Sequence, residues 1–415
     1  MSHKLIDLGF QYVSDFVESN SQTHLRKKYP LVLEWNEKLG CPTLTEQPSG
    51  EEMWGKYWYK SGTNHSMRYA LKDVVRGVVK HKKMHFEMGG DKKVWLDIAC
   101  NDGTLLSSVD EGFFVRIGID PIEEKYIAEA LHHADSIVQD YFTYDAWLRA
   151  KAPKKADVVT SIAMFYDLQD PFTFAEDVEK VLDDNGIWVL QLSYTPLMIQ
   201  QVAFDNILGE HYAYHNLTSV QRILNLANMK VLNAELNDVN GGSIRIYAVK
   251  KTADMNSFGS APLRDVWAMN VQALFNNEHH YDNLPVWNDF ANSVSILRMK
   301  TTDFIDKANR DGKSVWGYGA STKGNTLLQF FDLDNTKIEA IAERNPDKWG
   351  LHTIGSNIVI KSEADMREAQ PDYVLVLPWH FISEFIVRER EYLEKGGAFI
   401  VPCPTFRIYT KEDLK

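Results

Sequence analysis

The sequence predicts an α/β protein with two tandem Rossmann-like domains behind a short N-terminal leader. Two apolar runs, residues 94–96 and 314–316, each enter a glycine-containing turn. In both cases the next apolar run ends on an acidic residue, Asp120 in the first unit and Glu343 in the second. Strand-like and helix-like patterns alternate after each turn, which is typical of a doubly wound sheet.

Residues 1–66 are weakly periodic and rich in aromatic side chains, which favours a leader or lid packed on the next domain. From Met67 onward, the spacing of Leu71, Val74 and Val78 predicts an amphipathic helix. The pattern then predicts strands at 94–96, 115–119, 136–138, 157–162, 186–192 and 242–249, and helices from Leu105 onward and at 121–131 and 172–182. We therefore expect a first domain over residues 67–252.

Small and polar residues between positions 250 and 262 indicate a linker. A helical stretch over about 263–308 leads to expected strands at 314–316, 338–342, 373–377 and 398–401. These elements predict a second Rossmann-like domain over residues 263–415.

Composition narrows the class of protein. A chain of 415 residues with 44% apolar and 25% charged residues is typical of a globular protein of two or three domains. The net charge of -12 argues against a nucleic-acid partner. No signal-peptide pattern and no apolar stretch of about 18 residues is present, so we expect a cytoplasmic protein that does not enter a membrane. Cys41, Cys100 and Cys403 are too far apart in sequence to indicate a disulfide framework or a structural zinc site.

The first turn, Asp97-Ile98-Ala99-Cys100-Asn101-Asp102-Gly103, favours S-adenosylmethionine (SAM) over NAD. It has one glycine where a dinucleotide-binding loop has three, and Asp97 and Asn101 add polar side chains that suit the amino-acid end of SAM. Gly103 would let the backbone pass close to the ligand, and Asp120 would accept hydrogen bonds from the ribose hydroxyls. A glycine turn of any α/β protein remains the alternative.

Asp140 and Tyr141, with Phe142, follow the expected third strand and would meet the adenine with a carboxylate and an aromatic face. A helix cap followed by core aromatics would give the same pattern.

The second turn, Gly317-Tyr318-Gly319-Ala320-Ser321-Thr322-Lys323-Gly324, would suit a diphosphate. Gly317, Gly319 and Ser321 would present backbone amides at a helix N-terminus, Lys323 would add a cation, and Glu343 lies where a ribose contact belongs. A structural turn and an NAD site remain the alternatives.

Residues 204–215 gather carboxylates, histidines and phenols into a turn-like stretch. Proton abstraction needs a group that is partly neutral near pH 7 and is held in place, and a histidine beside a carboxylate meets both conditions. Glu210 and His211 are the natural candidates, and a solvated loop is the alternative.

At these positions the chain resembles the sugar C-methyltransferases that add a methyl to carbon 3 of nucleotide-linked keto-deoxysugars. The resemblance extends over nearly the whole chain. It rests on the Cys-Asn-Asp-Gly-Thr-Leu-Leu run within residues 96–106 and on matches at residues 57–62, 204–207, 210–211, 241–245, 317–326 and 378–381.

The resemblance implies a first domain with the class I SAM-dependent methyltransferase fold and a C-terminal domain that helps to hold the nucleotide sugar, with the active site between them. By position, His211 would be the base, assisted by Glu210, with Tyr57 and Tyr59 lining the sugar pocket. The enolate formed next to the ketone would attack the methyl of SAM, and no metal would be required.

Three departures accompany the resemblance. Members of this family usually carry an N-terminal zinc-binding module with several cysteines, whereas this chain keeps Cys41 alone, so we expect a degenerate remnant without zinc. Gly209-Glu210-His211 stands where His-Glu-His is usual, and residues 163–168 lack an asparagine and a histidine that many relatives carry. Methyl transfer to oxygen or nitrogen of a small metabolite, and a non-catalytic SAM- or sugar-nucleotide-binding role, stay open as alternatives, as do a monomer and a homodimer.

Overall fold

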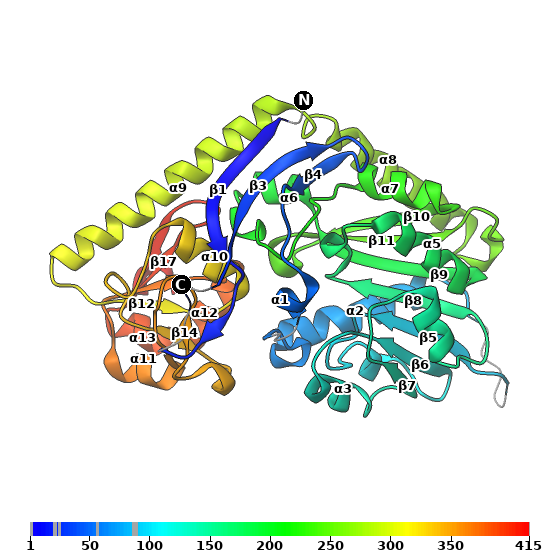
Figure 1. Ribbon diagram of the computed structural model, residues 1–415, viewed down its shortest axis with the longest axis horizontal. Helices are drawn as coiled ribbons and strands as arrows, with labels where there is room; N and C mark the ends of the chain where they lie inside the picture. Colours follow the sequence, from blue (N-terminus) through cyan, green and yellow to red (C-terminus); the bar gives the residue numbers. More distant parts are fainter. Residues whose placement is uncertain (1–2, 20–22, 24–25, 55–57, 85–89, 415) are drawn as a thin grey trace.

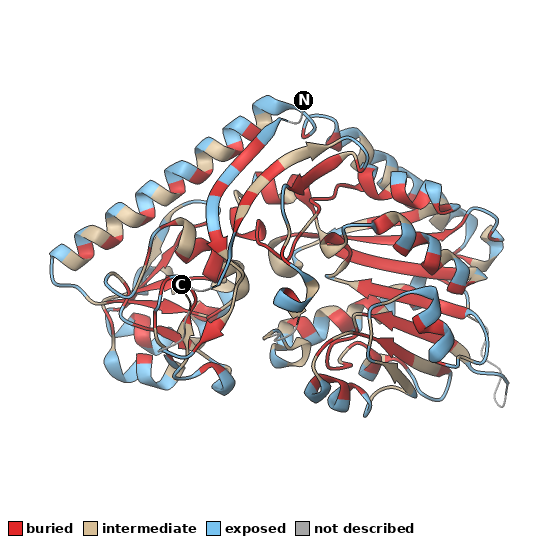
Figure 2. Cartoon of the chain, viewed as in Figure 1, coloured by how far each residue is buried: buried red, intermediate tan, exposed pale blue. Residues whose placement is uncertain are grey.

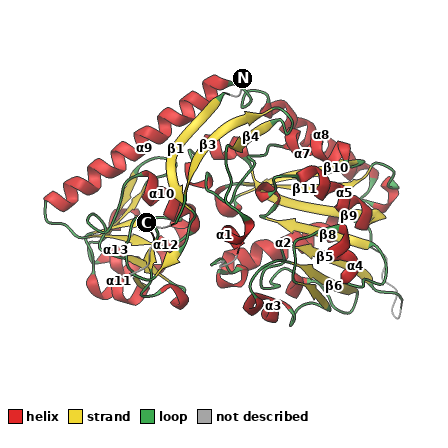
Figure 3. Ribbon diagram, viewed as in Figure 1, coloured by secondary structure: helices red, strands yellow, loops and turns green. Residues whose placement is uncertain are grey.

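A computed structural model of the protein describes residues 3–19, 23, 26–54, 58–84 and 90–414. These residues form two lobes, each built around a sheet that helices cover, with an N-terminal ribbon of strands running between them (Figure 1). The strands lie inside each lobe and the helices outside (Figure 3), and the buried residues concentrate on the strands (Figure 2). The α/β class with Rossmann-like sheets is confirmed.

The first lobe has a seven-stranded sheet with the order β10-β11-β9-β8-β5-β6-β7. Its parallel strands are β5 (Lys93–Ile98), β6 (Phe114–Ile119), β7 (Ser136–Val138), β8 (Ala156–Ile162) and β9 (Leu182–Ser193). β11 (Ser243–Lys250) runs antiparallel to both β9 and β10 (Met229–Asn237). The central strands β5 and β8 are almost wholly buried, as strands covered on both faces by helices must be.

The helices of the first lobe begin in different ways, and some of them have side-chain caps. α2 (His65–His81) buries Met67, Leu71, Val74 and Val78, one apolar face of a helix. The Asp170 side chain caps α5 (Pro171–Val181), and Asn216 forms a capping box with Ser219 at the start of α7 (Leu217–Leu226). The remaining helices are α3 (Glu124–Ala130), α4 (Tyr144–Arg149) and α6 (Thr195–Gln200).

The helix expected from Leu105 onward is wrong. Residues 99–105 form turns, and only a 3₁₀ turn, Leu106–Ser108, follows before β6 begins at Phe114. Leu105 and Leu106 pack in the same apolar cluster as α2 instead. The sequence pattern did not predict α4, α7 or β10.

The second lobe has a six-stranded sheet with the order β15-β13-β12-β16-β17-β18. β12 (Val315–Tyr318), β13 (Ile341–Glu343), β15 (Ile360–Ser362), β16 (Tyr373–Val376) and β17 (Ala398–Val401) are parallel, and β18 (Arg407–Tyr409) is antiparallel to β17. Its helices are α10 (Thr322–Phe330), α11 (Glu363–Ala369), α12 (Ile382–Arg388) and α13 (Arg390–Glu394). β15 and β18 were not expected.

The expected helical stretch over 263–308 is two helices, α8 (Ala261–Glu278) and α9 (Leu284–Arg310). The break occurs because Asn283 caps α9 through its side chain and Pro285 follows in the first turn. α8 packs on the first lobe and α9 along the second, so the chain passes from one lobe to the other at this break (Figure 1).

The N-terminal leader is a ribbon of strands rather than an aperiodic lid. β1 (Lys4–Tyr12), β3 (Lys28–Asn36) and β4 (Cys41–Leu44) form an antiparallel sheet, and β2 (Phe16–Val17) pairs with β14 (His352–Thr353) of the second lobe. The short helix α1 (Gly50–Trp54) follows and lies between the lobes (Figure 1). The leader therefore contacts both lobes, which local periodicity cannot reveal.

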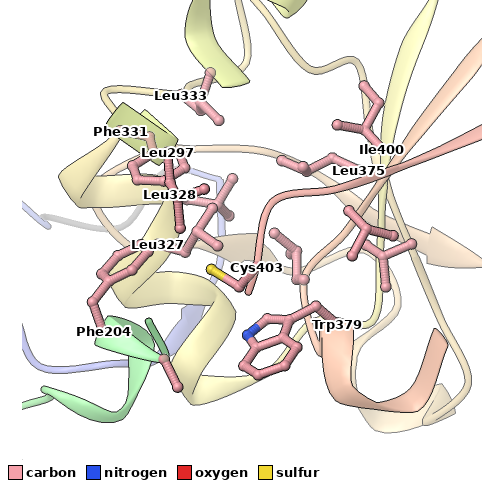
Figure 4. Close-up of a cluster of buried hydrophobic side chains, with 14 of the residues drawn as sticks. Phe204, Leu297, Leu327, Leu328, Phe331, Leu333, Leu375, Trp379, Ile400 and Cys403 are labelled. Carbon is pink, nitrogen blue, oxygen red and sulfur yellow. The ribbon is translucent and has the colours of Figure 1, made fainter. Parts of the chain in front are cut away.

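Side chains from the region after α6 are buried in the core of the second lobe. Phe204 stacks on Phe331 with ring centroids 5.3 Å apart and lies beside Leu327 and Leu328 (Figure 4). The indole of Trp379 donates a hydrogen bond to Asp205 Oδ2 at 3.0 Å. The two lobes thus share one apolar core at their junction. Over the described ranges, no helix has the length and apolar character needed to span a membrane.

Candidate active site

One cavity of about 860 Å³ lies among the leader, the first lobe and the second lobe. Both glycine turns and the candidate base open into it. Of the residues singled out from the sequence, those that line it are Tyr59, Asp97, Ala99, Asn101, Asp120, Tyr141, His211, Gly319, Ser321, Lys323 and Glu343. A concave site of this size that gathers polar groups from three parts of a chain is typical of an active site.

The first turn is held by its own polar groups. Ala99 and Asn101 have φ angles of 57° and 50°, which bend the chain sharply as it leaves β5. The Asn101 amide donates to Asp120 Oδ2 at 2.8 Å, and the Asn101 side-chain oxygen accepts from the Ser61 amide at 3.0 Å. The Asn101 side-chain nitrogen donates to the Tyr59 carbonyl at 3.1 Å. The turn therefore ties the leader to the edge of the first sheet.

Asp120, at the end of β6, keeps hydrogen-bonding capacity toward the cavity. Oδ2 accepts from Asn101, and Oδ1 accepts from the Ile122 amide at 2.9 Å. A carboxylate oxygen can accept two hydrogen bonds, so each oxygen retains one acceptor position. That capacity fits a pair of ribose hydroxyls.

Asp97 is buried at the end of β5 and accepts a hydrogen bond from the Thr160 hydroxyl at 2.6 Å. Burial raises the pKa of Asp97 to about 7, against the opposing effect of the Thr160 hydrogen bond. A cationic ammonium in the cavity would favour the ionised form, which suits the amino-acid end of SAM. Together, Asp97, Asn101 and Asp120 fit this cofactor.

Gly103 does not line the cavity. It has a φ of 75°, and a β-carbon there would lie 2.8 Å from the Ala130 Cα at the end of α3. The expectation that this glycine brings the backbone close to a ligand is therefore wrong, because it serves the packing of the turn against α3.

Asp140 also lies away from the cavity wall, whereas Tyr141 is part of it. The Asp140 carboxylate pairs with Arg149 at 2.5 Å, and this hydrogen bond lowers the pKa of Asp140. Asp140 is therefore placed for an ion pair at the surface rather than for the expected contact with adenine.

The imidazole of His211 is oriented by the backbone. Nδ1 lies 3.0 Å from the Asn206 carbonyl oxygen, which can only accept, so Nδ1 carries the proton and Nε2 keeps its lone pair. The ring packs against Tyr166 with centroids 4.1 Å apart. Burial, and secondly the charge of Lys323, lower the pKa of His211 to about 3, so the ring is neutral at pH 7.

Glu210 does not orient the His211 ring, because the described hydrogen-bond partner of that ring is the Asn206 carbonyl. Glu210 is buried, its Oε2 has no hydrogen-bond partner among the described residues, and burial raises its pKa to about 7. Its charge acts on Asp167, the other member of a pair of buried carboxyls: burial, and then the Glu210 charge, raise the pKa of Asp167 well above its usual range. The Gln47 amide joins the two segments by donating to the carbonyl oxygens of Asp167 at 3.0 Å and Glu210 at 2.8 Å.

Tyr59 lines the cavity and is 38% exposed. Tyr57, the other expected phenol, lies outside the described residues.

The second turn lies opposite the first. Gly319 has a φ of 80°, and a β-carbon there would lie 2.6 Å from Pro378, so only glycine fits. Ser321 caps α10 by accepting from the Gly324 amide at 3.0 Å, and Glu343 Oε1 accepts from the Arg344 and Asn345 amides. Gly317 does not lie where a contact with the diphosphate was expected, because it is within β12 and away from the cavity. A β-carbon there would lie 2.9 Å from the Ile341 side chain, so its small size serves packing within the sheet.

Sequence reasoning missed two cavity residues that could take part in chemistry, Asp167 and His380. Burial, and then the Lys323 charge, lower the pKa of His380 to about 3. Residues 378–381 were among the matches to the family, but no role was assigned to them. Asp167 is far in sequence from the other candidates. Only the fold brings them to the site.

Two family models match successive parts of the chain. Residues 64–234 match a model described as a methyltransferase domain, and residues 238–404 match a model described as a C-methyltransferase C-terminal domain. The C-methyltransferase NovU of Streptomyces niveus is 29% identical over 249 residues, which make up 60% of this chain and 57% of that protein. The chain thus aligns with little more than half the length of this relative.

Solved structures similar to part of the chain include a magnesium protoporphyrin IX methyltransferase of Synechocystis PCC 6803 with bound SAH, at 15% identity and a TM-score of 0.34, over 46% of this chain and 90% of that one. Another is an S-adenosylmethionine-dependent methyltransferase of Clostridium acetobutylicum, at 12% identity and a TM-score of 0.33, over 44% and 92% of the two chains. The chain is thus similar to a methyltransferase domain over residues 64–234 and to a C-methyltransferase C-terminal domain over residues 238–404.

Proposed function

We propose that the protein is a C-methyltransferase that uses SAM to methylate the carbon next to the ketone of a nucleotide-linked keto-deoxysugar. The observation that carries the proposal is the shared cavity: the turn around Asn101, the imidazole of His211 and the turn around Gly319 all line it. The similarity to NovU and the match to a C-methyltransferase C-terminal domain support transfer to carbon.

In this proposal Asp97, Asn101 and Asp120 hold the cofactor at the carboxyl edge of the first sheet. Tyr141 provides an aromatic wall beside it. When bound, SAM supplies an electrophilic methyl group on a positively charged sulfonium.

The second turn would hold the diphosphate of the sugar nucleotide. Gly319 and Ser321 lie at the N-terminus of α10, where backbone amides and the helix dipole favour an anion. Glu343 would accept a hydrogen bond from the nucleoside ribose. The keto sugar would then extend toward His211 and Tyr59.

His211 Nε2 accepts the proton from the carbon next to the ketone, while Nδ1–H stays on the Asn206 carbonyl. The C–H bond breaks, its electron pair delocalises onto the carbonyl oxygen, and the carbon then forms its bond to the methyl group. The low pKa of His211 keeps the imidazole ready to accept a proton at pH 7. Negative charge that develops beside Lys323 during the reaction would offset the charge that lowers this pKa, and would so strengthen the base.

The test is mass spectrometry of the protein incubated in deuterium oxide with SAM and a panel of thymidine- and uridine-diphosphate-linked keto-deoxysugars. We expect one methyl group on carbon and deuterium exchange at the same carbon. His211→Asn should lower the rate of exchange by about 10²-fold or more, as loss of a general base does, while SAM binding is kept.

The matched control is His280→Asn, since His280 is exposed and outside the cavity. It should keep the wild-type rate. A methyl group located on oxygen or nitrogen by fragmentation would contradict the proposal, and so would SAM binding with neither methyl gain nor exchange on any sugar.

A further inference from the structure

Lys323 occupies a position that the sequence did not lead us to expect. Its Nζ donates a hydrogen bond to the Asn240 carbonyl at 2.9 Å, across the junction between the second and first lobes. Asn240, Gly241 and Gly242 all have positive φ angles, and this turn between β10 and β11 points its backbone at the second lobe. The ammonium is thus fixed at the junction rather than free to follow a flexible diphosphate.

The charge of Lys323 has no close counter-ion. Among the described residues, no carboxylate oxygen lies within 4.0 Å of Nζ; Asp205, whose charge acts on it from farther away, accepts its own hydrogen bond from Trp379 instead. One hydrogen bond to a carbonyl leaves an ammonium with two further N–H donors. Lys323 also lines the cavity, so these donors have a possible partner there.

The charge of Lys323 acts on two neutral imidazoles. His211, on the first lobe, and His380, on the second, both line the cavity, and the Lys323 charge lowers the pKa of each. The cation therefore lies near enough to the proposed base for its charge to act on the ring, and both groups line the same cavity. Withdrawal of a proton next to a ketone places negative charge on the carbonyl oxygen, and a fixed donor in a water-poor site stabilises that charge most.

We propose that Lys323 is a catalytic residue whose ammonium donates a hydrogen bond to the carbonyl oxygen of the keto sugar and stabilises the enolate. This inference rests on the proposed function and changes the role expected of Lys323 from binding a diphosphate to stabilising an oxyanion. The lysine stays protonated throughout, so no proton is added to or lost from the balance given for His211.

The test compares wild type, Lys323→Gln and Lys323→Arg in deuterium exchange without SAM, at saturating concentrations of the sugar that the wild type exchanges. Lys323→Gln should lower the maximal exchange rate by about 10²- to 10³-fold, the loss typical of an oxyanion donor. The dissociation constant of the corresponding free nucleoside diphosphate should change less than about threefold, because in this role Lys323 does not touch the diphosphate. Lys323→Arg keeps the charge and should recover part of the rate.

Lys348 offers a matched control. It is a buried lysine of the same lobe that lines the cavity and donates to a carbonyl, that of Ala320, at 2.8 Å. Because Lys348 supports the second turn through the Ala320 carbonyl, Lys348→Gln should weaken nucleoside diphosphate binding and should lower the maximal exchange rate much less than Lys323→Gln does.

A Lys323→Gln enzyme that keeps its maximal rate but loses nucleoside diphosphate affinity would overturn the inference in favour of the diphosphate role, with the proposed function intact. Equal losses of the maximal exchange rate in Lys323→Gln and Lys348→Gln would also overturn it, since removal of any cavity lysine would then lower the rate. Failure of the wild type to exchange any sugar would instead reject the proposed function, and the inference with it. If Lys323→Gln does not fold, the arginine variant decides, because an unchanged diphosphate affinity with a reduced rate is expected only of an oxyanion donor.

Discussion

At the scale of single residues, burial shifts the protonation of ionisable groups in and beside the cavity. Glu210 and Asp97 have pKa values raised to about 7, and His211 has a pKa lowered to about 3. Burial disfavours the charged form of each group, so carboxyls tend to be protonated and imidazoles neutral. Such paired displacements are frequent at functional sites.

Glu210 makes stability depend on pH. Its folded pKa is above its usual value of 4.5, so its contribution is fully present below about pH 4.5 and is lost as the pH rises through about 7. The Glu210→Gln variant has no carboxyl to ionise at this position, so it lacks this loss of stability with rising pH. The free energy of unfolding of the variant, measured by urea denaturation, should therefore rise relative to wild type by on the order of 1–3 kcal/mol between pH 4.5 and pH 7.5.

Glu368→Gln provides the control, because Glu368 is exposed on α11. Its stability curve should run parallel to that of wild type. A Glu210→Gln curve that is also parallel would mean that Glu210 titrates near its usual pKa, and the account of the carboxyl pair would fail.

At the scale of elements, the first turn illustrates how a correct motif can be given an incorrect reason. Asp97 and Asn101 follow β5 and line the cavity, as the sequence pattern indicated. Gly103 belongs to the same motif, but its contacts are with Ala130. A pattern of residue types identifies a turn, whereas the neighbour that requires the glycine is set by packing.

Gly103→Ala should destabilise the protein in two ways. A residue with a β-carbon at a φ of 75° costs about 1–2 kcal/mol, and the clash with the Ala130 backbone at 2.8 Å adds overpacking of about 1–3 kcal/mol. Urea denaturation measures the sum, which we expect to be at least about 2 kcal/mol.

Gly312→Ala separates the two costs. Gly312 has a φ of 70° but nothing within 4 Å of its β-carbon position, so only the backbone cost of about 1–2 kcal/mol should appear. Equal losses for the two variants would show that the contact with Ala130 has no energetic consequence.

At the scale of the whole molecule, the two lobes are joined by more than the chain between α8 and α9. β2 of the leader adds to the second lobe through β14, and Phe204 is buried with Phe331 and Leu328. These contacts hold the edges of the two sheets around one cavity. The site therefore depends on the junction as much as on either sheet.

Phe204→Ala should cost about 3–5 kcal/mol, the usual loss for a phenylalanine removed from a core. Because the ring joins the lobes, calorimetry should also show a broader or split unfolding transition. Phe10→Ala is the control, since Phe10 is 68% exposed and should lose less than about 0.5 kcal/mol. A single transition that Phe204→Ala leaves unchanged in both shape and midpoint would contradict a shared core.

The sequence by itself determined the α/β class, the two glycine turns and most strands of both sheets, because each depends on residues close together in the chain. Apolar runs that end in a turn and then an acidic residue specify strand, loop and ligand contact locally. Some strands that were missed depend on partners far away in the chain, as β2 of the leader does on β14 of the second lobe, because a strand is stabilised only when it pairs with its neighbour.

Only the tertiary structure decided which of the candidate residues meet. It brought Asp167 and His380 to the cavity, moved Asp140 and Gly103 away from it, and fixed Lys323 to a carbonyl of the other lobe. Burial and long-range charge set the protonation of His211 and Glu210, and neither can be read from residue types. The physical reason is that backbone conformation is mostly a local property, whereas the electric field and packing at a site are sums over the whole fold.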